Sequence, residues 1–235
     1  MISEFFADGM IPWSPILLSL KVAGLATAAS FCAGVAAAWL LARRRSPFSA
    51  VLDAMCTLPM ILPPTVLGYY LILLVGRRGV IGPWLAECGI NLIFSWQGAV
   101  VAATVVVFPL IYKSARAALE LVDPRLENAA RTLGASEWKV FWQVSLPLAW
   151  RGIVAGGMLA FARGMGEFGA TLFMAGNYIG ITRTIPIAIY FEWMNGNDST
   201  AWFWTLVIIV FSLIVIVFIN LWSNHTMKYR KREQK

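Results

Sequence analysis

Residues 201–222 form an apolar run in which no side chain is charged. A helix that crosses a bilayer needs about 20 consecutive apolar residues, so this run predicts a transmembrane helix. Four further stretches carry a similar signal, and they are residues 16–41, 58–76, 96–112 and 152–175. The pattern predicts an all-α integral membrane protein with five transmembrane helices, or six if a segment near 83–95 or 180–194 also crosses.

The overall composition agrees with this pattern. Of the 235 residues, 59% are hydrophobic and 13% are charged, whereas a soluble domain carries about 25% charged residues. The apolar runs are spread over the whole length, so we expect no separate soluble domain. Residues 185–194 are apolar but too short to cross, and we expect an interfacial or re-entrant helix there.

The basic residues set the expected orientation. If the tail is cytoplasmic, five spans place the loops 42–57 and 113–151 on the same side, and these three segments hold 14 of the 19 lysines and arginines. Cytoplasmic loops carry such an excess of basic residues. We therefore expect a periplasmic segment at 1–15, a membrane domain at 16–222 that includes the cytoplasmic loop, and a basic cytoplasmic tail at 223–235.

The second predicted span contains Pro59, Pro63 and Pro64. Backbone groups that proline leaves unpaired are tolerated at membrane depth only against protein or a watery cavity. This span is therefore expected to face a partner or a transport path rather than lipid.

The stretch from Asp123 to Pro147 is the longest polar-containing segment between apolar runs, and its local chemistry predicts two short helices. Asp123 can cap the first helix, and Pro124 suits its first position. Gly134 fits the left-handed conformation that ends such a helix. Ser136 can cap the second helix, which is expected to stop before Pro147 because proline cannot continue the interior hydrogen bonding.

Each of these two short helices has an apolar face. The apolar positions are Leu126, Ala129, Ala130 and Leu133 in the first helix and Trp138, Phe141 and Trp142 in the second. The small residues of the first helix would let a partner approach closely. The aromatic residues of the second are expected to pack against the spans of the chain itself.

The same stretch resembles the cytoplasmic coupling loop in the permeases of ATP-binding-cassette (ABC) importers. The family pattern is Glu-Ala-Ala, three residues, Gly, nine residues and Ile-x-Leu-Pro, and this chain has Asn128-Ala129-Ala130, Gly134 and Val144-x-Leu146-Pro147. Asn128 stands where the family has a glutamate, with Glu127 one position earlier, and Val144 replaces isoleucine. A role that needs a charge at position 128 is therefore in question.

The resemblance implies a type I ABC importer permease core. It also implies a separate ATPase that docks on the coupling loop 113–151. The residues that it assigns to this contact are Glu127, Asn128, Ala129, Ala130, Gly134, Ala135, Leu146 and Pro147.

The fourth predicted span contains Arg163 and Glu167, which share a helix face at i, i+4. Ionisable residues inside a membrane are functional-site candidates, and an ion pair that only makes both charges tolerable is an equal alternative. Residues 161–171 resemble the fourth-span signature of oxyanion importers for molybdate and sulfate. Residues 76–82 and 182–186 resemble the molybdate permeases more narrowly.

Hydroxyl groups and helix amino termini can replace the hydration of an oxyanion without binding it too tightly. Thr65 and Thr171 lie beside the helix breakers Pro64 and Gly169. The candidate residues of a substrate path are Thr65, Arg163, Glu167 and Thr171.

The family resemblance also implies the partners and the location. It implies a homodimer in the bacterial inner membrane, with two ATPase subunits and one extracellular binding protein, that imports molybdate and shares the route with tungstate. One alternative is a sulfate or thiosulfate permease. Another is an ion-coupled secondary transporter in which Glu167 is the coupling site.

The chain itself offers no pattern for catalysis or metal binding. A phosphate-binding loop needs G-x-x-x-x-G-K-[ST], and no lysine here follows a glycine. The three cysteines lack paired spacing and there is a single histidine. We expect no catalytic residue, metal or cofactor in this chain, ATP on the partner ATPase, and no nucleic acid. Three arginines are expected on the outer side of the membrane, where they either steer the anion, dock the binding protein or are simply solvated. They are Arg77, Arg78 and Arg183.

Overall fold

The computed structural model describes residues 13–43 and 46–233, and the regular secondary structure in this part is helical. Most of the segment predicted at 1–15, the basic residues Arg44 and Arg45, and the side chains of the tail 223–235 lie outside the description. The elements are α2 (Ser14–Leu41), α3 (Pro47–Ile61), α4 (Pro64–Val75), α5 (Gly82–Glu87), α6 (Trp96–Glu120), α7 (Pro124–Thr132), α8 (Glu137–Val140), the π-helical turn η1 (Phe141–Ser145), α9 (Leu146–Met165), α10 (Gly169–Ala175), α11 (Ile185–Met194) and α12 (Asp198–Glu233).

Within the described residues, four helical stretches are long and apolar enough to cross a membrane. They are α2, α6, the continuous helix Glu137–Met165 and the part Asp198–Ile219 of α12. The bent pair of α3 and α4 brings the number to five, which agrees with the predicted five. α11 has 10 residues and is too short to cross, as its sequence predicted.

The second span is broken, so the prediction of a single helix at 58–76 is wrong. α3 and α4 meet at an angle of 115°. Leu62 between them has an extended backbone with ψ of 139°, because the ring of a following proline disfavours the helical region. Pro63 and Pro64 then begin α4, where a missing N–H group costs little.

The fourth span also differs from the single helix predicted at 152–175. The helix begins at Glu137, passes through η1 into α9 and ends at Met165, after which α10 covers Gly169–Ala175. Pro147 does not stop this helix, because a π-helical turn precedes it and the N–H group of Leu146 bonds to the carbonyl of Phe141. The predicted second short helix and the fourth span are therefore one helix.

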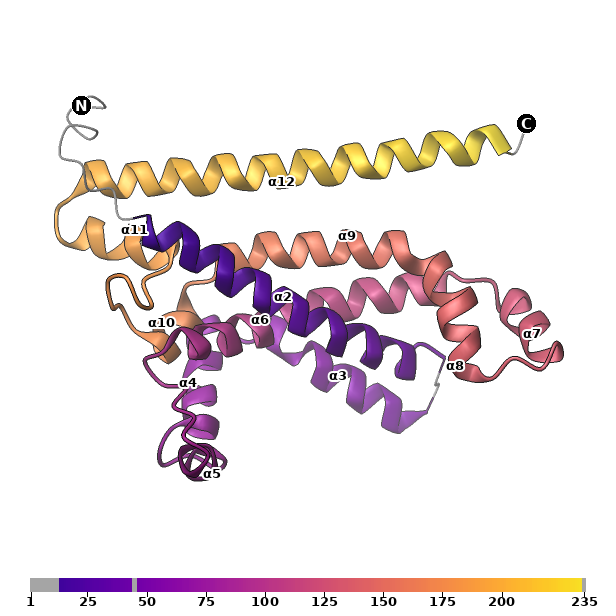
Figure 1. Ribbon diagram of the computed structural model, residues 1–235, viewed down its shortest axis with the longest axis horizontal. Helices are drawn as coiled ribbons and strands as arrows, with labels where there is room; N and C mark the ends of the chain where they lie inside the picture. Colours follow the sequence, from indigo (N-terminus) through magenta and orange to yellow (C-terminus); the bar gives the residue numbers. More distant parts are fainter. Residues whose placement is uncertain (1–12, 44–45, 234–235) are drawn as a thin grey trace.

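α2, α6 and α9 pack against one another, and α12 runs along α9 (Figure 1). α7, α8, the carboxyl end of α2, the start of α3 and the carboxyl end of α12 lie at one end of the molecule, whereas α5, α10 and α11 lie at the other. The described parts of the segments that were predicted to share a side thus lie toward the same end of the molecule. α4 points away from the bundle, with α5 near its tip.

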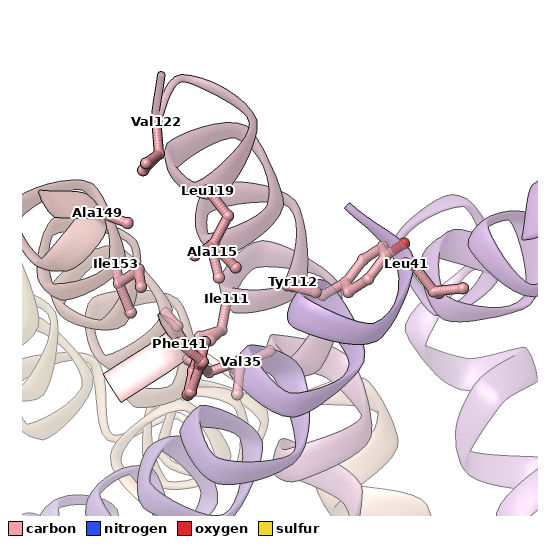
Figure 2. Packing of buried hydrophobic residues seen from close by; sticks show 13 residues of the cluster. Val35, Leu41, Ile111, Tyr112, Ala115, Leu119, Val122, Phe141, Ala149 and Ile153 are labelled. Carbon is pink, nitrogen blue, oxygen red and sulfur yellow. The ribbon is translucent and has the colours of Figure 1, made fainter. Parts of the chain in front are cut away.

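The core between α2, α6 and α9 is closely packed. Its cluster includes Val35, Ile111 and Ile153, one from each helix, and extends to Phe141 of η1 (Figure 2). A Cβ atom added at Gly156 would lie only 2.3 Å from the Cβ of Ser114. Such small residues let helices approach closely in a bilayer, where van der Waals packing rather than burial from water holds them together.

Candidate functional site

α7 begins and ends as its sequence predicts. The side chain of Asp123 accepts a hydrogen bond of 2.9 Å from the backbone N–H of Arg125, and Pro124 takes the first helical position. Gly134 follows the helix with a φ of +82°, in the region that favours glycine. Ser136 then caps α8 through the N–H of Lys139. These local signals give α7 a fixed place after α6.

α7 has an exposed outer face. Leu126 is 50% exposed and Leu133 is 89% exposed, although both are apolar. Asn128, Ala129 and Gly134 are exposed as well, and so is Pro147 further along. Ala130, Ala135 and Leu146 are partly buried. Of the eight residues assigned to an ATPase contact, Asn128, Ala129, Gly134 and Pro147 are therefore exposed.

Glu127 lies on the opposite, inner side of α7 and is only 3% exposed. Its carboxylate lies 2.8 Å from Nη2 of Arg43 and accepts a hydrogen bond of 2.7 Å from the hydroxyl of Ser145. Glu127 is thus separate from the accessible surface that its neighbours form. Its sequence position gave no sign of these partners, because Arg43 is far away in the chain.

The prediction that the aromatic face of the second short helix packs inward holds for Phe141 only, because Trp138 is 59% exposed and Trp142 is 51% exposed. The Phe141 ring is buried and lies 4.8 Å from the ring of Trp39 in α2. Trp138 also meets Trp39, with ring centroids 5.7 Å apart. These contacts fix α8 and η1 against the end of α2.

A second polar link holds α7 to α8 at the surface. The guanidinium of Arg131 donates a hydrogen bond of 2.6 Å to Glu137. This bond raises the pKa of Arg131. The Arg131 guanidinium therefore stays charged at neutral pH.

Arg163 and Glu167 form the predicted ion pair, with 2.8 Å between Nη1 and Oε2. The pair spans the break between α9 and α10 and does not lie within one helix. The other carboxylate oxygen of Glu167 accepts a hydrogen bond of 3.0 Å from the N–H of Ala170, at the start of α10. The Glu167 side chain is 2% exposed and that of Arg163 is 40% exposed.

The two helix breaks lie next to each other. A Cβ atom at Gly169 would lie 2.9 Å from the Cβ of Pro64, so the starts of α4 and α10 touch. Thr65 is exposed beside this contact. Thr171 is 1% exposed, and its hydroxyl has no hydrogen-bond partner among the described residues. The predicted path residues thus lie within a few sequence positions of the two helix breaks. Of the four, Thr65 and Arg163 are exposed, whereas the other two are buried.

Arg183 is buried and paired, so the interpretation of this residue as a solvated charge is wrong. It is 8% exposed, pairs with Glu192 at 2.7 Å and donates a hydrogen bond of 2.7 Å to Asn177. A buried and paired guanidinium does not lie in solvent. Arg77 and Arg78 are exposed.

Sequence reasoning missed a charged cluster between α3 and α6. Asp53 accepts hydrogen bonds from the hydroxyl of Tyr112 at 2.7 Å and from Lys113 at 3.1 Å. Arg116 also pairs with Asp53 and with Glu120. One feature of the sequence could have pointed to this charged cluster. Asp53 is the only acidic residue between Asp8 and Glu87.

Comparison with known proteins places the chain in a family. Residues 30–227 match the family described as "Binding-protein-dependent transport system inner membrane component". The chain belongs to this family. It is a permease subunit, the translocation component of an ABC transporter, and the predictions of a translocation role and of an ABC importer permease core are confirmed.

Several curated relatives in this family carry transport names. The chain is 52% identical over 179 residues to the "Molybdenum transport system permease protein ModB" of Escherichia coli, covering 76% of this chain and 78% of the relative. It is 41% identical over 228 residues to the "Putative molybdenum transport system permease protein YvgM" of Bacillus subtilis, covering 95% and 96%. The "Sulfate transport system permease protein CysW" of Synechocystis is 34% identical, covering 91% and 77%.

Solved structures share the fold. A chain of the MetNI methionine ABC transporter in an inward-facing conformation matches with a TM-score of 0.68 at 16% identity, covering 88% of this chain and 91% of that chain. A chain of a bacterial alginate ABC transporter matches with a TM-score of 0.68 at 17% identity, covering 92% and 79%.

Proposed function

We propose that this permease imports molybdate, in an ATP-driven complex that depends on a binding protein. The observation that carries the proposal is the identity of 52% to a molybdenum transport permease. Relatives named for sulfate transport are 34% and 36% identical. Tungstate, an oxyanion of the same shape and charge, would share the route.

In this proposal a separate ATPase docks on the accessible face of α7. Exposed leucines on a soluble loop, such as Leu126 and Leu133, are typical of an interaction surface. Small residues beside them let the partner approach closely. ATP is bound and hydrolysed by this partner, and the chain itself carries no cofactor.

The orientation and assembly belong to the proposal as well. The amino-terminal segment 1–15 is periplasmic, and the coupling loop 113–151 and the tail 223–235 are cytoplasmic, because the basic residues gather there. Two copies of the membrane domain 16–222 enclose the path, since a two-fold pair is the simplest closed assembly. A periplasmic binding protein delivers the anion to the opposite end.

The path is proposed to pass the junction of the two helix breaks. Arg163 is 40% exposed although it belongs to a membrane-crossing helix, and such a charge is expensive in lipid. It therefore faces water or a partner. Its pairing with Glu167 weakens its hold on an anion, which favours release. Thr65 and Thr171 complete the candidate set.

The proposal is tested with purified chain, its ATPase and its binding protein in lipid vesicles. We expect uptake of molybdate that requires ATP and all three components, with sulfate competing weakly. Vesicles that hold only this chain serve as the control and should show no uptake. Uptake by the chain alone, driven by an ion gradient, would show a secondary transporter instead. Faster uptake of sulfate than of molybdate would show that the proposed substrate is wrong.

A further inference from the structure

Three residues join α7 to the transmembrane helices, and we call Arg43, Glu127 and Ser145 the inner node. Glu127 is the centre of the node, with Arg43 at 2.8 Å and the Ser145 hydroxyl at 2.7 Å. Arg43 lies just after α2, and Ser145 ends η1 immediately before α9. A single buried carboxylate therefore links α7 to the ends of two membrane-crossing helices.

The node also reaches a third such helix. The guanidinium of Arg43 donates a hydrogen bond of 3.3 Å to the carbonyl of Val122, two residues after α6. The ends of α2, α6 and α9 thus meet α7 at one point. These three helices form the packed core, so a displacement of α7 at the node acts on the core directly.

The α9 end of the node is a place where the helix can change shape. π-helical turns inside α-helices are rare and occur often at functional sites. Here Ser145 closes such a turn, and Pro147 follows it without an N–H group to donate. Helices bend at positions of this kind. The hydrogen bond from Ser145 to Glu127 is made at this point.

We propose that the inner node transmits the movement of α7 to α2 and α9, with Glu127 as a positioning residue. This inference rests on the proposed function, in which an ATPase docks on the outer face of α7. Glu127 is buried, so it does not offer its carboxylate to that partner. It holds the helix that the partner moves, and charge-assisted hydrogen bonds are about twice as strong as neutral ones.

The neighbouring charged groups supply the control. Glu137 and Glu127 both pair with Arg131, the latter at 3.4 Å. The side chain of Glu137, unlike that of Glu127, is 67% exposed. The hydrogen bonds that Glu137 accepts come from Arg131, within the α7–α8 segment. Glu137→Gln therefore makes the same chemical change on the same loop and leaves the direct bonds of Glu127 to Arg43 and Ser145 in place.

The experiment compares Glu127→Gln, Ser145→Ala and Glu137→Gln in the full importer, reconstituted in vesicles with its ATPase and binding protein. Glutamine keeps the shape of glutamate but loses the charge that Arg43 pairs with. Three quantities are measured: the amount of ATPase that stays bound during purification, the rate of ATP hydrolysis, and the number of molybdate ions imported per ATP. We expect all variants to retain the ATPase. Import per ATP should fall about tenfold in Glu127→Gln and about threefold in Ser145→Ala, as lost hydrogen bonds to a charged group predict, and should not change in Glu137→Gln.

The double variant tests whether the two residues act through one bond. Glutamine can still accept the hydrogen bond from Ser145, so this comparison uses Glu127→Ala. Glu127→Ala with Ser145→Ala should import no less per ATP than Glu127→Ala alone, whereas additive losses would overturn the link. Normal import per ATP in Glu127→Gln, or loss of its ATPase on purification, would each overturn the positioning role. Should the Glu127→Gln chain fail to fold and insert, Ser145→Ala, which deletes one hydroxyl, decides in the same way. A wild-type chain that retains no ATPase would contradict the proposed function instead.

Discussion

The need for glycine at position 134 comes from the backbone conformation there and not from a lack of space for a side chain. Its φ is +82°, and a Cβ atom added there would meet nothing within 4 Å. Gly134→Val therefore costs about 1–3 kcal/mol through backbone strain alone. We expect the variant to insert normally but to import less molybdate per ATP, because the chain leaving α7 is redirected.

Gly134→Asn is the matched control, since asparagine tolerates the left-handed region. It should keep most of the import. Equal import by the valine and asparagine variants would show that the turn after α7 has no part in coupling.

Glu167 has two bonds to lose, one to Arg163 and one to the start of α10. Glu167→Ala should lower the stability by about 2 kcal/mol, less than the cost for a fully buried pair because Arg163 is 40% exposed. Arg163→Ala combined with Glu167→Ala should recover only part of the folded yield, because the bond to the Ala170 N–H remains lost. The measurement is the monodisperse fraction in detergent. No recovery at all would show that the pair adds nothing to folding.

The sequence predicts those residues whose role is decided by near neighbours. Asp123, Gly134 and Ser136 act within a few positions of themselves, and the structure has them as predicted. The partners of Glu127 and Asp53 come from other helices. The packing of α2 and α9 decides which residues of α7 become buried. A local sequence pattern does not contain information about that packing.

At the scale of helices, the lengths of the apolar runs predict the straight spans but not the broken ones. Pro59 and Pro109 lie inside α3 and α6, which continue through them. Pro63 and Pro64 follow an extended Leu62 and separate two helices. Proline is tolerated or disruptive in a transmembrane helix according to whether neighbours satisfy the freed carbonyls. That depends on tertiary packing.

The contact between α6 and α9 provides a prediction about packing. A Cβ atom at Gly156 would lie 2.3 Å from the Cβ of Ser114, so Gly156→Ala must push the two helices apart, at about 1–3 kcal/mol. Gly24→Ala in α2 is the control, because nothing lies within 4 Å of its Cβ position and alanine is the better helix former by about 1 kcal/mol. Thermal unfolding in detergent should show a lower midpoint for Gly156→Ala only. Equal midpoints would mean that α6 and α9 are not tightly packed in the membrane.

At the scale of the whole molecule, the fold is shared with importer chains at identities of 16% and 17%. Such similarity persists because apolar length, small residues at helix contacts and basic loops define the architecture without fixing most residues. The same general features predicted the fold class here. They also predict an orientation, which a chemical test can decide.

The orientation is tested by the three cysteines, which are free thiols in different surroundings. Cys88 is exposed just after α5, Cys32 is exposed on α2 and Cys56 is partly buried on α3. An impermeant maleimide added to intact spheroplasts should label Cys88, because its end of the molecule is proposed to be periplasmic. Cys32 faces lipid or a helix, where a charged reagent does not enter, and Cys56 should react from the cytoplasmic side or not at all. Cys88→Ser should abolish the labelling, and inside-out vesicles should show none at Cys88 until they are opened. Labelling of Cys88 in inside-out vesicles alone would reverse the orientation and, with it, the side on which α7 meets the ATPase.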